Sequence, residues 1–266
     1  MLDAKTADFD DLIGDYPNFD KTDLRDRCVE ELSLRCQTQL KALDERMTNR
    51  PGPLNGSLKI WCRNNEELMR CSADLLRNAD TARAEAEQRR LKVIESDPMM
   101  AGMTTGEKTA SASGWVSQRF QALQEIENGF QPLDLTPTTS IYRGGALLIE
   151  DFMERFPEGE EVILQHMTAC TISSDFAPLF YAKKQYDDLQ GAASEVCSYM
   201  LEIQLKTPQR STMHWTAHIK GENAATTYRW QLEVIAPTDF QYRVEAVKLI
   251  TPDGYPKLYQ VTATEV

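Results

Sequence analysis

TTYRWQLEVIAP, residues 226–237, is the most informative segment of this 266-residue chain. Its apolar residues fall on alternate positions, which predicts a β-strand with one face toward a core. These apolar residues are Trp230, Leu232 and Val234. The other face carries Gln231 and Glu233, an amide and a carboxylate two residues apart, just after a loop that ends in Tyr228. A strand that presents these two groups side by side is a candidate functional site.

The composition of the chain excludes several classes of function. With 41% hydrophobic and 26% charged residues the composition is globular, and 266 residues are enough for one large domain or for a compact domain with a helical extension. A formal net charge of −12 disfavours a nucleic-acid or anionic-membrane partner. The sequence contains no run of eighteen apolar residues, so no membrane span is predicted. Residues 1–20 are acidic, lack the pattern of a Sec signal peptide, and are expected to be loosely ordered.

The cysteines and histidines show no spacing that is typical of a metal site. The six cysteines are Cys28, Cys36, Cys62, Cys71, Cys170 and Cys197. No two of them form a CxxC pair, so buried, reduced thiols are expected. The three histidines are His166, His214 and His218. None has a cysteine or carboxylate at zinc-ligand spacing, and we therefore predict no metal.

The first half of the chain has the periodicity of helices. The predicted helices span residues 23–47, about 58–94 and 115–128. NRPGPLNGS, residues 49–57, separates the first two. The small, polar and aperiodic residues near 96–114 predict a flexible loop before the third.

The second half has the pattern of short strands. The candidate strands are SIYRGGALL (140–148, running into a glycine turn), one or two in 160–174, VCSYMLEIQL (196–205), the segment around Glu233, YRVEAVKLI (242–250) and KLYQVTAT (257–264). DFAPLFYAKK, residues 175–184, is either a short helix or an ordered loop. Helices followed by strands predict an α+β fold.

Three segments together resemble the Arg-Ser-Glu class of mono-ADP-ribosyltransferase toxins and effectors. They are IYRGG with Arg143, CTISS (170–174) and QLE (231–233). The surroundings of QLE are similar to those of the catalytic glutamate in clostridial Rho-modifying exoenzymes. FYAK, residues 180–183, resembles the aromatic and basic pair that follows the family's hydroxyl strand. The chain departs from the pattern by having Thr-Ile-Ser for Ser-Thr-Ser and lysine for arginine.

The resemblance implies a fold and a division of the chain. The expected fold is α+β and ADP-ribosyltransferase-like, with two packed, mainly antiparallel β-sheets, flanking helices and a preceding helical region. The expected catalytic domain is 112–266, after a loosely ordered N-terminus (1–20) and a helical region (21–111).

The resemblance also implies a role for each candidate residue. Glu233 would stabilise the positive charge that develops on the ribose, and Thr171 or Ser173 would donate a hydrogen bond to it. Gln231 would orient a neutral acceptor, with Tyr228 touching the target. The expected NAD-binding residues are Arg143, Gly144, Phe180 and Lys183.

The expected function is cleavage of NAD, as co-substrate, and transfer of ADP-ribose to a non-arginine side chain of a eukaryotic host protein. Such proteins without a signal peptide are often bacterial effectors secreted by a non-Sec route into the host cytosol, with cytoplasmic residence as the alternative. The helices at 23–95 are a candidate site for a secretion chaperone or the target. An NAD glycohydrolase, a guanine-modifying enzyme and a non-catalytic binding module of the same fold remain open.

Overall fold

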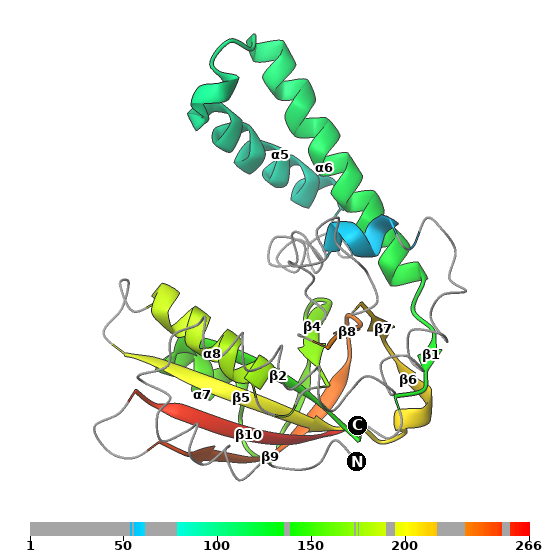
Figure 1. Cartoon of the computed structure of the whole chain (residues 1–266), viewed down its shortest axis with the longest axis vertical. Helices are drawn as coiled ribbons and strands as arrows, with labels where there is room; N and C mark the ends of the chain where they lie inside the picture. Colours follow the sequence, from blue (N-terminus) through cyan, green and yellow to red (C-terminus); the bar gives the residue numbers. More distant parts are fainter. Residues whose placement is uncertain are drawn as a thin grey trace.

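The computed structural model describes residues 54, 56–61, 79–135, 139–172, 174, 176–189, 195–216, 232–251 and 256–266. It combines a helical hairpin with a strand-rich region that holds most of the buried residues (Figure 1). The predicted helix at 23–47 and four of the six cysteines lie outside the described residues. Among the residues that are described, no helix is both long and apolar enough to cross a membrane.

The hairpin consists of α5 (Ala79–Ser96), the short 3-10 turn η2 (Pro98–Met100) and α6 (Thr105–Asn128). The predicted flexible loop near 96–114 is therefore wrong for its second half, which is the start of α6. A capping box explains the earlier start, because Thr104 Oγ1 accepts from the Glu107 N–H at 3.3 Å and a Glu107 oxygen accepts from the Thr104 N–H at 2.8 Å. This Thr-x-x-Glu signal is present in the sequence among the small residues that predicted a loop.

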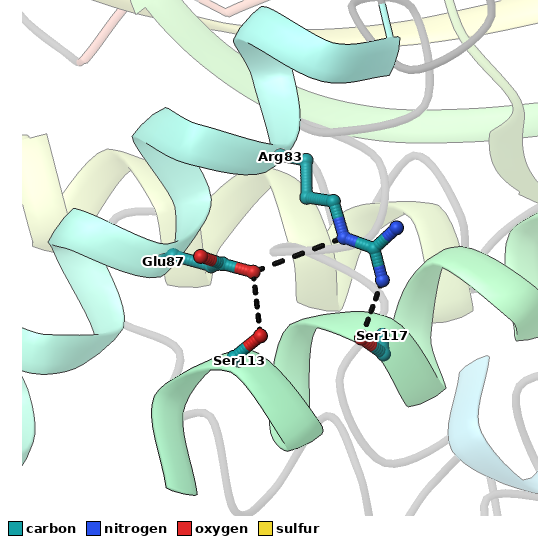
Figure 2. A network of polar contacts seen from close by, with 4 residues as sticks. All are labelled: Arg83, Glu87, Ser113 and Ser117. Atoms are coloured by element: carbon teal, nitrogen blue, oxygen red, sulfur yellow. Dashed lines mark hydrogen bonds and ion pairs between the residues drawn. The ribbon is translucent and has the colours of Figure 1, made fainter. Parts of the chain in front are cut away.

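Small and polar side chains join the two helices of the hairpin. Glu87 of α5 accepts a hydrogen bond from Ser113 of α6 at 2.9 Å, and Arg83 of α5 donates one to Ser117 of α6. Figure 2 shows both contacts between the helices. Arg83 and Glu87 are also 3.8 Å apart as an ion pair along α5. These contacts lie beside the buried alanines Ala82, Ala86 and Ala112. Such small residues let two helices approach closely.

The C-terminal part of α6 packs against the strand-rich region. Ile126 and Phe120 of α6 belong to a buried cluster that also contains Ile235 from β8 (Glu233–Ala236). His214 of β7 (His214–Trp215) is completely buried, and its Nε2 lies 2.8 Å from the Ile126 carbonyl oxygen. The His214 ring also stacks on Phe130 with centroids 4.3 Å apart. These contacts attach α6 to the β7–β8 edge of the sheet.

The strands form two mainly antiparallel sheets, as predicted for this α+β protein. The larger sheet has the order β3-β9-β10-β5-β2-β4-β8-β7. Its other strands are β2 (Ser140–Leu148), β3 (Glu161–Ile163), β4 (Thr168–Thr171), β5 (Val196–Gln204), β9 (Gln241–Leu249) and β10 (Leu258–Glu265). Only β10 and β5 pair in parallel among the strand pairs of the described residues. β1 (Pro132–Leu133) and β6 (Ser211–Thr212) form the small sheet, and β6 follows the 3-10 turn η3 (Pro208–Arg210).

The main core lies on one face of β5, whose alternation the sequence predicted correctly. The core residues of β5 and the residue just after it are Cys197, Tyr199, Leu201, Ile203 and Leu205. Cys170 and Cys197 are buried free thiols, as expected for reduced cysteines. Burial raises the pKa of the Cys170 thiol to about 12 and that of Cys197 to about 11. α7 (Ile149–Arg155) adds Phe152 to this core.

Gly144 and Gly145 lie within β2, so the predicted glycine turn after IYR is wrong. The glycines are needed for close packing rather than for a turn. A Cβ on Gly144 would lie 1.6 Å from the Pro178 carbonyl oxygen of α8 (Phe176–Leu189). A Cβ on Gly145 would lie 2.5 Å from the Tyr199 hydroxyl of β5. The absence of side chains lets β2 continue straight beneath α8.

Candidate functional site

The three segments singled out in the sequence contribute Arg143 to β2, Thr171 to β4 and Glu233 to β8, which are consecutive strands of the large sheet. Tyr142 of β2 pairs in register with Thr171 of β4, and Thr171 pairs with Glu233 of β8. Directly paired residues present their side chains on the same face of a sheet. Tyr142, Thr171 and Glu233 therefore form a lateral row, which we call the glutamate row.

Glu233 is a buried carboxylate at the start of β8, with 7% of its surface exposed. The Thr216 hydroxyl, just after β7, donates a hydrogen bond to Glu233 Oε1 at 2.8 Å. The Thr216 N–H also donates to the Glu233 carbonyl oxygen at 3.1 Å, which continues the β7–β8 ladder. Glu233 thus lies between a threonine on β4 and a threonine beside β7. A buried carboxylate needs such donors, because removal from water is otherwise costly.

The backbone before Glu233 is not a regular strand. Leu232 has φ 44, a left-handed conformation that is unusual for a bulky residue, and its carbonyl oxygen accepts from the Ile172 N–H at 3.2 Å. β8 therefore begins at Glu233, and the predicted strand from Trp230 can be compared only from Leu232 onward, because Trp230 and Gln231 lie outside the described residues. Leu232 and Val234 both belong to the main core, as the predicted alternation requires. The other face is buried as well, because Ile235 belongs to the α6 cluster.

Two helices limit the face that carries the glutamate row. Strand alternation puts Ile235 on the face of Glu233, and Ile235 packs in the cluster with α6. On β2, alternation puts Gly144 on the face of Tyr142, and Gly144 lies against Pro178 of α8. Because β2 and β8 are both antiparallel to β4, the α6 contact and the α8 contact lie on the same side of the glutamate row, at the level of Ala169.

Arg143 lies next to this row but not on the same face. Alternation along β2 directs Arg143 away from Tyr142, toward the side of Tyr199 and Leu201. Its Nη1 donates to the Ala169 carbonyl oxygen of β4 at 2.7 Å, and it also hydrogen-bonds to Tyr199. Arg143 is half-buried and fastens β2 to β4 beside the Tyr142–Thr171 pair. Its predicted contact with NAD stays a prediction.

The far end of the glutamate row carries a second carboxylate that the sequence analysis did not single out. Glu202 of β5 pairs in register with Tyr142. Its Oε1 accepts from the Tyr142 hydroxyl at 3.3 Å and from Ser140 Oγ at 3.2 Å. Glu202 thereby orients Tyr142. Neither of these two residues is among the predicted site residues.

The candidate residues on α8 have partners within the helix. Lys183 is an i,i+4 ion partner of Asp187 at 2.6 Å, and 13% of its side-chain surface is exposed. Phe180 is half-buried and meets Tyr181 edge to face, with centroids 5.5 Å apart. Both residues stay predictions as NAD contacts. DFAPLFYAKK is helical from Phe176, the first of the two alternatives expected for it.

Three predicted site residues, Ser173, Gln231 and Tyr228, lie outside the described residues. Thr216 is the clearest residue that sequence reasoning missed. It belongs to no motif, and only the pairing of β7 with β8 brings it to Glu233. Among the residues that the structure describes, no group of three or more His, Cys, Asp or Glu side chains could hold a metal ion.

The chain is similar to several solved structures. No protein-family model matches the sequence, and no curated protein matches it either. The Vis toxin, an ADP-ribosyltransferase from Vibrio splendidus, is similar at 11% identity and a TM-score of 0.46, covering 92% of this chain and 82% of that one. Plx2a, an ADP-ribosyltransferase toxin from Paenibacillus larvae, is similar at 13% identity and a TM-score of 0.43, covering 93% and 97%. The Clostridium limosum C3 exoenzyme is similar at 12% identity and a TM-score of 0.41, covering 93% and 95%.

Proposed function

We propose that this protein is a mono-ADP-ribosyltransferase of the Arg-Ser-Glu class, which cleaves NAD and transfers ADP-ribose to a protein. One observation carries the proposal. The segments that resemble this class are far apart in the sequence, yet their residues Arg143, Thr171 and Glu233 lie on the consecutive strands β2, β4 and β8. The carboxylate of the third segment is buried and lies in register with the hydroxyl residue of the second, as Thr171 pairs with Glu233.

The proposed chemistry needs a carboxylate held in a fixed place. Cleavage of the bond between nicotinamide and ribose leaves the electron pair on nicotinamide and builds positive charge on the ribose. A carboxylate that is already oriented stabilises that charge without reorganising during the reaction. Glu233 has these properties, because it is 7% exposed and hydrogen-bonded at Oε1. In this proposal Thr171 supports Glu233 from β4, with Ser173 as the second hydroxyl of the segment.

The residues around β2 and α8 would bind NAD. Arg143 would hold the phosphates or a ribose either directly or by fixing β2 against β4, to which it donates at 2.7 Å. The other residues that would contact NAD are Gly144, Phe180 and Lys183.

The proposed acceptor is a non-arginine side chain of a host protein. Gln231, two residues before Glu233 in the sequence, is an amide that can orient a neutral nucleophile but cannot take a proton from it. Tyr228 would contact the acceptor protein. We further propose that the chain is a bacterial effector delivered by a non-Sec route into the host cytosol.

Labelled NAD tests the proposal directly. The protein is incubated with NAD that carries a label on the adenylate half, with and without a eukaryotic lysate, and nicotinamide release is measured in parallel. A labelled protein band that disappears in Glu233→Gln supports transfer to protein. Free ADP-ribose alone supports a glycohydrolase, labelled nucleic acid supports a guanine-modifying enzyme, and no turnover supports a binding module.

Two controls make the result specific. Glu161→Gln removes a carboxylate from β3, where Glu161 pairs with Arg243 at 2.6 Å on the surface, and it should keep wild-type turnover. Agmatine, a small guanidinium compound, should not become labelled if the acceptor is not an arginine. Wild-type turnover in Glu233→Gln would refute the assignment of the site.

A further inference from the structure

Thr216 has an unusual set of contacts for a residue outside the recognised segments. It is 2% exposed, and its hydroxyl donates to Glu233 Oε1 at 2.8 Å. The same hydroxyl oxygen lies 3.2 Å from the Glu233 carbonyl oxygen, and the Thr216 N–H donates to that carbonyl at 3.1 Å. Backbone and side chain of Thr216 are thus both directed at one residue, the proposed catalytic glutamate.

We propose that Thr216 is a positioning residue that holds the Glu233 carboxylate in its productive orientation. This inference rests on the proposed function, since it assigns a role to Thr216 only through Glu233. Glu233 then has a hydroxyl residue on each side, with Thr171 in register on β4 and Thr216, which donates the hydrogen bond, beside β7. The motif segments supply only the first of the two.

Thr216 would act by restricting the rotation of the Glu233 carboxylate. A glutamate side chain has three rotatable bonds, and a hydrogen bond to one carboxylate oxygen restrains the last of them. Hydrogen bonds to charged groups are stronger than those between neutral groups. A carboxylate fixed before the reaction stabilises the developing charge on the ribose better than one that must first be oriented.

The role of the hydroxyl can be separated from the role of the strand. The Thr216 backbone is held by its ladder bond to Glu233, and the neighbouring pairs His214–Ile235 and Trp215–Val234 continue that ladder. Thr216→Val keeps the branched shape and the strand preference while removing the donor. Thr216→Ser keeps the donor while removing only a methyl group.

Thr168 provides a matched control. It is also 2% exposed, and it pairs with Ala236 of the same strand β8. Its hydroxyl donates to the His166 carbonyl oxygen at 2.9 Å rather than to Glu233. Thr168→Val therefore removes a buried threonine hydroxyl next to β8 and should leave NAD cleavage within a few-fold of wild type.

The experiment measures nicotinamide release over a range of NAD concentrations for the wild-type protein and the variants Thr216→Val, Thr216→Ser and Thr168→Val. We expect Thr216→Val to lower kcat about 10- to 100-fold, the rate equivalent of one hydrogen bond to a charged group. KM should change by less than about threefold, and Thr216→Ser should recover most of the loss. A general loss of packing would instead lower the activity of Thr216→Ser and Thr168→Val as well.

The outcomes separate this inference from the proposed function. If wild type cleaves NAD, Glu233→Gln does not, and Thr216→Val matches wild type, the role of Thr216 is overturned while the proposed function stands. If wild type does not cleave NAD, both are overturned. If Thr216→Val does not give folded protein, Thr216→Cys, which has only a weak donor, takes its place. Wild-type kcat in folded Thr216→Cys would equally overturn the role.

Discussion

Gly144→Ala should lower the melting temperature of this protein by about 5–10 °C. The new Cβ would lie 1.6 Å from the Pro178 carbonyl oxygen and 2.5 Å from its carbon atom. Real Cβ atoms keep at least 3.0 Å from such atoms, so β2 and α8 must separate by at least about 1.4 Å. The obstacle is backbone, which cannot turn aside as the end of a long side chain can.

The expected magnitude follows from the cost of overpacking. Extra methyl groups in a close-packed site cost about 1–3 kcal/mol and occasionally more. In a domain of this size 1 kcal/mol shifts the melting temperature by about 2–4 °C. A displacement of helix backbone belongs in the upper half of that range, at about 2.5 kcal/mol, which gives the drop stated above. Thermal unfolding followed by far-UV circular dichroism measures it.

Gly114→Ala is the matched control. Gly114 lies inside α6, and a Cβ there would meet nothing within 4 Å. Alanine stabilises an exposed helix interior by about 0.5–1 kcal/mol over glycine, so this variant should melt at the same temperature or slightly higher. A Gly144→Ala protein that keeps its melting temperature but loses NAD affinity would refute the packing argument. Gly144 would then serve the close approach of the ligand alone.

Three further predictions test the site and the core. Arg143→Lys should weaken NAD binding at least about tenfold and lower stability, because a lysine cannot reproduce the planar guanidinium that bonds to Ala169 and Tyr199; calorimetry with unchanged NAD affinity would remove Arg143 from the site. Gln231→Ala and Tyr228→Ala should release nicotinamide within a few-fold of wild type but transfer far less ADP-ribose, since water needs no positioned acceptor; equal losses in both assays would place these residues in NAD binding. Cys170 and Cys197 should not react with a thiol reagent at pH 8 in the native protein, because burial raises their pKa values to about 12 and about 11. Mass spectrometry measures the modification, and rapid modification of either cysteine would contradict its burial.

The sequence by itself determined the local elements with strong patterns. β5 was predictable because Cys197, Tyr199 and Leu201 alternate toward one core, and a two-residue period is visible without knowledge of the partner strands. The order of helices and then strands likewise predicted an α+β fold. The three candidate segments were identified from their residues and order, and Arg143, Thr171 and Glu233 do lie on consecutive strands.

Where the sequence analysis failed, the deciding information lay in other parts of the chain. The glycines after Arg143 suggested a turn, but α8 comes so close to β2 that no side chain fits there. The alternation around Glu233 predicted one face toward a core, but both faces are buried, because α6 covers the face of Ile235 and the main core covers that of Val234. The early start of α6 is the exception, because its capping box was visible in the sequence.

The surroundings of Glu233 were decided only by tertiary structure. Thr216 reaches Glu233 because β7 pairs with β8, and Glu202 joins the glutamate row because β5 pairs with β2. Strand order and register follow from how all the elements share two cores, and no short segment encodes them. A sequence motif can therefore name the carboxylate, but only the assembled sheet determines which hydroxyl holds it.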